Sequence, residues 1–148
     1  MVGTDDDGLG EEAQRGFAAA DDTLGAYTGL YRLVLLAYGN RCALTGARFA
    51  PPVLTLHADL EVEAIQPREE GGPLAIGNYL PMITGLARPF RDGLITIEDD
   101  YRIVVPHPDL LDGELLSVLR VGLMLPDEAM FRPGQEFLAH HRRYALGR

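Results

Sequence analysis

The chain has 148 residues, of which 47% are hydrophobic and 24% are charged. This size and balance are typical of one domain with a real core rather than of a disordered chain. No apolar run approaches the roughly 18–20 residues of a membrane span, and the acidic start lacks a signal-peptide pattern. A lone cysteine, Cys42, excludes an internal disulfide and a zinc site built of cysteines. We therefore expect a cytoplasmic protein that does not contact membranes.

The net charge of −9 opposes nonspecific binding to a phosphate backbone. Much of the negative charge lies at the start, because residues 1–12 hold five acids and no base. This composition predicts a flexible acidic arm over residues 1–22, with a short helix possible in principle over 13–22. No long linker divides the rest, so residues 23–148 are expected to form one domain.

The first half of that domain starts with a helix predicted over residues 24–38, with Thr23 as N-cap and Gly39-Asn40 as its end. RCALTGARF (41–49) follows as a strand pair that bends at a Thr-Gly step. Residues 51–67 read as extended structure, and the Gly-Gly-Pro sequence at 71–73 breaks the chain into a loop.

The second half alternates helices with a hairpin. Residues 78–90 predict a short helix in spite of Pro81, and residues 92–107 predict a β-hairpin that turns at Glu98-Asp99-Asp100. Residues 109–123 fit either a strand or a helix. PGQEFLAHHRRYAL predicts a C-terminal helix with Pro133 in its first turn.

Four stretches in this order resemble the HNH endonuclease family, in its restriction endonuclease subgroup. They are AYGNRCALTG (37–46), EAIQPREEGGP (63–73), Asn78, and ARPFRDGLITI (87–97). The corresponding family pattern is AYGxxCxxTG, acid-His-Ile-x-Pro with GGP, Asn, and His-Arg-x-Phe-Asp-x-Gly-Leu. The resemblance covers residues 27–145. It implies an α+β single domain with a ββα-metal core, flanking N-terminal and C-terminal helices and a β-hairpin.

In that family one divalent cation such as Mg²⁺ lies between a hairpin and a helix, and a strand histidine accepts a proton from the attacking water. By this resemblance Glu63 matches the first metal ligand and Asn78 matches the asparagine that braces the loop. Ala64 stands where the general base is expected, and Ala87 stands where the helix histidine is expected. Losing a general base typically costs about 10²–10⁴-fold in rate. We therefore expect no confident catalytic residue, with Glu63 and Asn78 as remnants, and no metal site unless Glu63 supports one.

Several residues offer stand-in or binding roles. His57 on the same extended stretch, or Glu69 and Glu70 in the loop, could replace lost ligands, although a surface histidine and a solvated acidic loop are the simpler interpretations. Arg88 and Arg91 match the place where the family meets DNA, and they could equally pair with nearby acids.

The terminal helix adds a second basic candidate. Its sequence His140-His141-Arg142-Arg143 could bind phosphate or a partner, or it could simply place cations at a helix C-terminus, where they are favourable. Arg142 and Arg143 are therefore the remaining candidates for nucleic-acid contact.

Three functions remain open. The first is a degenerate HNH-like domain that acts by binding nucleic acid or a protein partner. The second is an active endonuclease that uses Glu63, Mg²⁺ and substitute ligands, and the third is an acidic interaction module, in one version a homodimer, that never binds DNA. Metal binding separates the second from the others, and nucleic-acid binding at physiological salt separates the first from the third.

Overall fold

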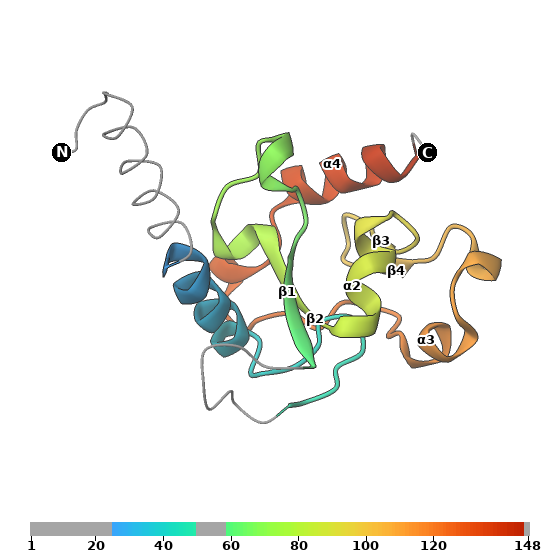
Figure 1. The fold of residues 1–148 in the computed structure, drawn as a ribbon, viewed down its shortest axis with the longest axis horizontal. Coiled ribbons are helices and arrows are strands. Elements are labelled where there is room, and N and C mark those ends of the chain that lie inside the picture. The colour runs from blue at the N-terminus through green and yellow to red at the C-terminus, as the bar shows by residue number, and fades with distance from the viewer. Residues whose placement is uncertain (1–24, 50–58, 147–148) are drawn as a thin grey trace, which may run out of the picture.

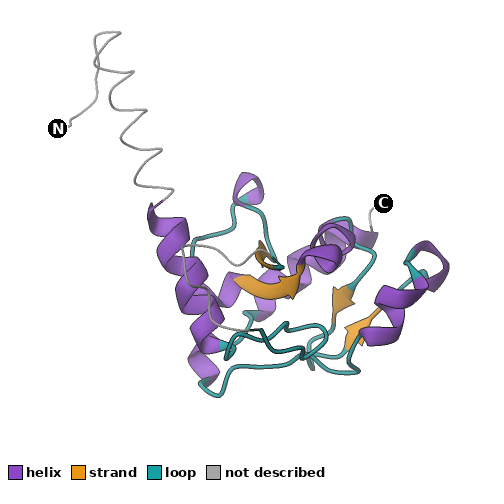
Figure 2. Ribbon diagram, turned by 60° about the horizontal axis from the view of Figure 1, so that its bottom comes forward, coloured by secondary structure: helices purple, strands orange, loops and turns teal. Residues whose placement is uncertain are grey.

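The computed structural model describes residues 25–49 and 59–146, and it has an α+β architecture with two small antiparallel sheets (Figure 1). The predicted acidic arm, the Thr23 cap and His57 lie outside these residues. Figure 2 shows the strands surrounded by helices and long loops, and one continuous hydrophobic core joins them. No helix in the described part of the chain is long and apolar enough to cross a membrane.

The first described element is helical over residues 25–37, in agreement with the predicted helix. Apolar residues recur at helical spacing and form its buried face, which comprises Leu30, Tyr31, Val34, Leu35 and Tyr38. The helix ends where Gly39 and Asn40 adopt left-handed backbone angles, with φ of 63° and 56°. The Asn40 amide donates to the Leu35 carbonyl at 2.8 Å, which satisfies one of the last helical carbonyls.

The predicted strand pair over residues 41–49 is reduced to a tight turn with one bridge between Arg41 and Arg48. Cys42 receives a hydrogen bond from Gly46 and donates one to Ala47, both at 2.8 Å. The cysteine is fully buried, so it acts as a small core residue. Ala43 then donates to the Pro81 carbonyl at 2.8 Å and fixes the turn to the central hairpin.

The central hairpin pairs β1 (Leu60–Ala64) with β2 (Tyr79–Ile83) in antiparallel register, with Ala64 opposite Tyr79. The predicted helix over 78–90 is therefore wrong in its first half. Residues 79–82 are buried on both faces, and the Pro81 carbonyl is used by the Ala43 amide, so tertiary burial overrides the local pattern. Only the second half is helical, as α2 (Thr84–Arg91), which packs on both strands.

The second hairpin is confirmed in a shortened form. β3 (Thr96–Ile97) pairs with β4 (Ile103–Val104), and the turn between them is closed by the Tyr101 amide, which donates to Glu98 at 2.8 Å. Residues 109–123, left open between strand and helix, contain the short helix α3 (Gly113–Val118). Asp112 caps α3 by accepting from the Glu114 amide at 2.8 Å.

The C-terminal helix α4 (Gln135–Leu146) starts two residues after Pro133, so the prediction of proline in its first turn is wrong. The Pro133 carbonyl accepts from the Tyr101 hydroxyl at 3.0 Å, and the Gly134 amide donates to Gly77 at 3.0 Å. These contacts fix Pro133 and Gly134 in place before the helix begins. α4 packs against β3 and brings its histidines toward the loop between β1 and β2.

Candidate functional site

The loop between β1 and β2 is organised around Asn78, which is fully buried. Its Oδ1 accepts from the Gln66 amide at 2.9 Å, while its Nδ2 donates to the Gln66 and Pro73 carbonyls at 2.9 and 3.0 Å. Gly72 lies so close that a Cβ there would be 1.8 Å from the Gln66 carbonyl oxygen. The Gly-Gly-Pro sequence and Asn78 therefore act together to give the loop one fixed shape.

The two alanines of the resembling pattern lie on β1, which leads into this loop, and on α2, which follows β2 and packs on both strands. Ala64 is the last residue of β1, and Ala87 is buried in α2 with 2% of its surface exposed. Within the described ranges, no three His, Cys, Asp or Glu residues are grouped so that they could hold a metal ion. The donor set in this part of the chain does not fit the divalent cation that the resemblance implies.

Glu63 is instead engaged by Arg91 from the last turn of α2. Arg91 Nε donates to one carboxylate oxygen at 2.8 Å and Nη2 donates to the other at 2.9 Å. The side chain of Glu63 is 13% exposed and that of Arg91 is 52% exposed. The hydrogen bond and charge of Glu63 raise the pKa of Arg91, and Glu61 and Asp92 add to this effect. The sequence left open whether Arg91 binds phosphate or pairs with a nearby acid, and in the structure it pairs with Glu63.

An open pocket of about 470 Å³ lies over the end of β1, the loop and the end of α2. Four of its lining residues are acidic, namely Glu63, Glu69, Glu70 and Asp92, and two are basic, namely Arg68 and Arg91. Its aromatic wall includes Tyr27 and Tyr79, whose ring centroids are 6.5 Å apart in an edge-to-face arrangement. Burial, followed by the charge of Glu63, raises the pKa of Tyr27.

Burial also raises the pKa of Tyr79, against the opposing charge of Arg68, so both phenols are neutral at physiological pH. The pocket therefore presents neutral tyrosine side chains beside carboxylates and arginines.

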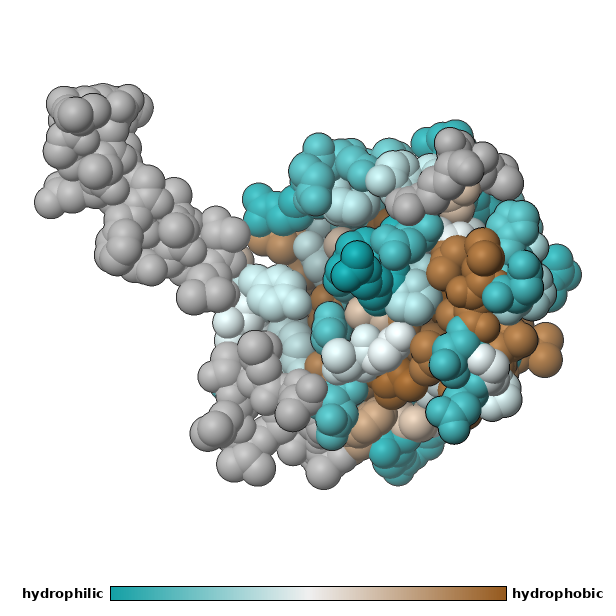
Figure 3. Space-filling view, turned by 45° about the vertical axis from the view of Figure 1, so that its right-hand side comes forward, coloured by the Kyte–Doolittle hydropathy of each residue, from teal (hydrophilic) through white to brown (hydrophobic). Residues whose placement is uncertain are grey.

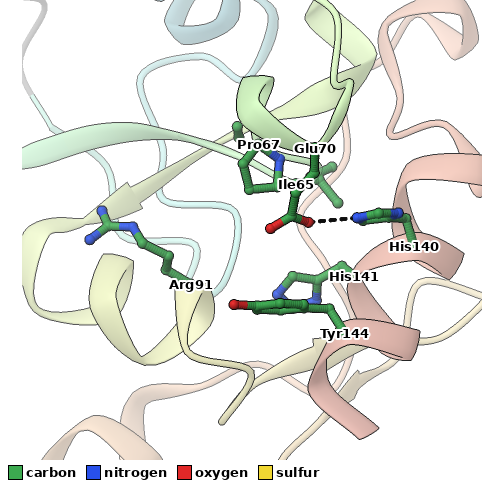
Figure 4. A pocket seen from close by; sticks show the side chains of 8 residues that line it. Ile65, Pro67, Glu70, Arg91, His140, His141 and Tyr144 are labelled. Atoms are coloured by element: carbon green, nitrogen blue, oxygen red, sulfur yellow. Dashed lines mark hydrogen bonds and ion pairs between the residues drawn. The ribbon is translucent and has the colours of Figure 1, made fainter. Parts of the chain in front are cut away.

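A second cavity, of about 10 Å³, lies beside Ala64 and is closed by α4. Figure 4 shows Glu70 pointing at His140, with His141 and Tyr144 below this pair. His140 Nε2 donates to Glu70 at 2.6 Å, and His141 Nε2 donates to the Phe90 carbonyl at 2.8 Å. Such a volume holds about one water molecule. Ala64 therefore borders both this small cavity and the open pocket of about 470 Å³.

The sequence did not reveal the contact between His140 and Glu70. The two residues are 70 positions apart, and no local pattern joins a loop acid to a helix histidine at that separation. Glu70 could replace a lost metal ligand only by giving up its hydrogen bond to His140 on α4. Glu69 lines the open pocket.

The remaining arginine candidates differ in how they are engaged. Arg88 is 83% exposed and lies 3.7 Å from Asp92. Arg142 donates to the Ile97 carbonyl and to Asp99, both at 2.6 Å, so its guanidinium holds α4 to the second hairpin. Arg143 is exposed on α4. Arg91 and Arg142 thus contribute to internal contacts, whereas Arg88 and Arg143 face outward.

Comparisons with known proteins give a structural likeness. No protein-family model and no curated protein sequence matches the chain. Among solved structures, the chain is similar to a modification-dependent TagI restriction endonuclease, with a TM-score of 0.56 and 20% sequence identity over 78% of this chain. The match spans 36% of that protein. The small α+β domain therefore shares its fold with part of that protein.

Proposed function

We propose that this chain is an HNH-like nuclease domain that has lost hydrolysis and acts by binding nucleic acid or a protein partner. The observation that carries this proposal is the pair of methyl groups at Ala64 on β1 and Ala87 on α2, where the resembling pattern has histidines, while Asn78 still braces the loop that follows β1. A methyl group can neither accept a proton nor bind a cation. The frame supports the likeness to a nuclease, and the missing groups support the loss of its reaction.

The size of the proposed loss of hydrolysis follows from what the missing groups normally contribute. A positioned base typically contributes about 10²–10⁴-fold to a rate, and a divalent ion needs several oxygen ligands in addition to substrate phosphates. The only carboxylate at the matched ligand position, that of Glu63, is already held by Arg91. The alternative of an active endonuclease with substitute ligands would have to break this pair.

Nucleic-acid binding would rest on few positive groups. Arg88 and Arg143 are the outward-facing members of the four candidate arginines, since Arg91 and Arg142 make internal contacts. Two phosphate contacts on a protein of net charge −9 give weak and strongly salt-sensitive binding. The acidic first twelve residues are expected to compete with phosphate for the same arginines.

A protein partner is the second candidate, and exposed apolar side chains near α3 favour it. Leu110, Val118 and Val121 are 61%, 48% and 80% exposed. Figure 3 shows apolar surface, in brown, interrupting the hydrophilic surface on one face of the molecule. Exposed apolar groups in a contiguous stretch are a common feature of protein interfaces.

Hydrolysis is tested with purified protein and plasmid DNA in the presence of magnesium, manganese, nickel or zinc. We expect no degradation above the background of a mock purification. Cleavage that disappears on Glu63→Ala would contradict the proposal and favour the endonuclease alternative.

Binding is tested by fluorescence anisotropy with labelled DNA and RNA at low and physiological salt. The full chain and a chain without residues 1–12 are compared, and the shortened chain is expected to bind more tightly. If neither binds at low salt, the nucleic-acid version is dropped and the protein-partner version replaces it.

A further inference from the structure

We propose that the exposed side of α3 is a docking surface for a basic amphipathic segment of a protein partner. This surface, the α3 face, consists of three apolar and three acidic exposed side chains, namely Leu110, Val118, Val121, Asp109, Asp112 and Glu114. The proposal rests on the proposed binding function and names the chemistry of its partner. It also places binding away from Glu63 and Ala64, because Figure 1 shows α3 at one edge of the molecule, with α2 between it and β1.

The apolar side chains of the α3 face are not used by the protein's own core. Leu110 and Val121 are 61% and 80% exposed, whereas their neighbour Leu111 is 6% exposed and packs into the core. Figure 3 shows apolar surface, in brown, bordered by hydrophilic surface, in teal. Apolar groups left in water gain free energy when a partner covers them, so this surface favours protein docking.

Backbone hydrogen bonds hold Val121 in its exposed position. Its carbonyl accepts from the Ile103 amide at 2.8 Å, and the preceding amide, that of Arg120, donates to the Leu44 carbonyl at 2.9 Å. At the other end of the segment, Asp112 caps α3. A partner would therefore meet an apolar surface that is already ordered, and little conformational entropy would be lost on binding.

The charges of the α3 face indicate the kind of partner. Residues 106–121 carry three acids and one arginine, Arg120. The side chain of Arg120 lies against the turn at Gly46, with its Cδ 3.4 Å from where a Cβ on that glycine would stand. Within the described ranges, neither Asp109 nor Glu114 takes part in an ion pair. The apolar surface is thus edged by negative charge, which lysine or arginine side chains complement.

The same charges count against two other occupants of this face. Nucleic acid would bring its phosphates against the three acids. A second copy docked through the same face would set the acids of each copy against those of the other, because a two-fold interface uses one patch twice. A basic amphipathic helix instead supplies a row of apolar side chains together with cations.

The test uses fluorescence anisotropy at physiological salt with the full-length protein and three labelled peptides. The first is a helical peptide of leucine and lysine, about 14 residues long, with its leucines on one face. The second keeps the lysines and replaces the leucines with glutamine, and the third keeps the leucines and replaces the lysines with glutamate. We expect the first to bind, the second to bind at least about tenfold more weakly, and the third not to bind.

A pair of double variants assigns the apolar contact to the α3 face. Val118→Ser/Val121→Ser should weaken binding of the leucine–lysine peptide by about tenfold, because the two side chains form the apolar part of the contact. Leu33→Ser/Leu36→Ser is the matched control, since these side chains are 51% and 74% exposed on the helix over 25–37. It should leave the affinity unchanged.

A second pair of double variants tests the charge contact. Asp109→Asn/Glu114→Gln should weaken binding of the same peptide by about fivefold and reduce its dependence on salt. Asp112 is left unchanged because it caps α3. Asp127→Asn/Glu128→Gln is the control, because it removes the same charge from exposed acids outside the α3 face. It should change the affinity by less than about twofold.

Nuclear magnetic resonance of the ¹⁵N-labelled wild type gives a readout that depends on no variant. Addition of the unlabelled leucine–lysine peptide should shift the amide signals of Glu114, Val118 and Val121. The signals of Leu33 and Leu36 should stay in place. This measurement decides the location of the contact even if a double variant fails to fold.

Four results would overturn the proposal: no binding of the leucine–lysine peptide, equal binding of the glutamine–lysine peptide, an equal loss in the Leu33→Ser/Leu36→Ser control, or amide shifts confined to other elements. Sedimentation that shows a wild-type dimer and a monomeric Val118→Ser/Val121→Ser variant would also overturn it, in favour of a second copy. Each of these results leaves the proposed loss of hydrolysis standing if plasmid DNA stays uncut. Metal-dependent cleavage by wild type would instead remove the proposed function itself.

Discussion

Asn78 and Gln66 are joined by two hydrogen bonds of 2.9 Å that run in opposite directions, one donated by the Gln66 amide and one donated by the Asn78 side chain. The asparagine side chain thereby makes the two backbone hydrogen bonds to Gln66 that a residue on a neighbouring strand would make. It extends the β1–β2 pairing beyond Ala64, where the Ile65 amide also donates to the Asn78 carbonyl at 2.8 Å. Residues 67–70, which line the pocket over Glu63 and Ala64, follow directly on this extension.

Replacing Asn78 with alanine should therefore destabilise the protein. The change removes three side-chain hydrogen bonds of the fully buried Asn78 and leaves backbone groups of Gln66 and Pro73 without that partner. We expect a loss of about 2–4 kcal/mol in the free energy of unfolding, measured by urea titration. Gln135→Ala is the control, because this exposed side chain makes one bond to Asp99 and should cost less than about 0.5 kcal/mol. Equal losses for the two variants would contradict the bracing role.

Gly72 offers a steric test of the same loop. A Cβ at this position would lie 1.8 Å from the Gln66 carbonyl oxygen, so Gly72→Ala forces the backbone apart. We expect a loss of at least about 3 kcal/mol or failure to fold. Gly113→Ala, at the start of α3 where a Cβ meets nothing within 4 Å, should be neutral or slightly stabilising. A Gly72→Ala protein with wild-type Tm would show that the loop has another shape.

Tyr38 predicts an alkaline limit to stability. Burial, with a smaller contribution from Tyr101, raises its pKa above the ordinary phenol value, and its hydroxyl finds no hydrogen-bond partner among the described residues. A raised folded-state pKa means that stability is fully present below about pH 10 and is lost as the pH rises further. Tyr38→Phe should reduce this alkaline loss in Tm and keep or raise stability at pH 7 by up to about 1 kcal/mol.

The comparison for Tyr38 is Tyr101→Phe, because the Tyr101 hydroxyl donates to the Pro133 carbonyl at 3.0 Å. Losing this bond should lower stability at pH 7 by about 1 kcal/mol. A Tyr38→Phe protein that is clearly less stable than wild type at pH 7 would show that the hydroxyl has a partner.

The arginines give a prediction about salt dependence if nucleic acid binds. Arg88→Ala/Arg143→Ala should lower the slope of log affinity against log salt concentration by roughly two, at unchanged Tm. Arg142→Ala should lower Tm instead, because its guanidinium bonds to Ile97 and Asp99 at 2.6 Å. Anisotropy at several salt concentrations and thermal unfolding measure the two effects separately. An unchanged slope in the double variant would place any contact elsewhere.

Local sequence patterns determined those parts of the fold whose cause is local. The helix over 25–37 follows from apolar spacing and from the Gly39-Asn40 end, and the second hairpin follows from alternation around an acidic turn. The identity of Ala64 and Ala87, which removes a base and a ligand from the resembling pattern, is likewise visible in the chain itself. These features depend on backbone preferences and on side-chain chemistry, which each residue carries with it.

Only the tertiary structure determined which residues of the chain contact one another. Residues 79–83 became a strand because burial between β1 and the turn at Ala43 outweighed their local pattern. Arg91 reached Glu63 across 28 residues, and His140 reached Glu70 across 70. An ion pair or hydrogen bond depends on distance and direction in space, and these are fixed only after the core has packed. For that reason the sequence named the charged residues of this site, and the packing of α2 and α4 against the hairpin determined which of them meet.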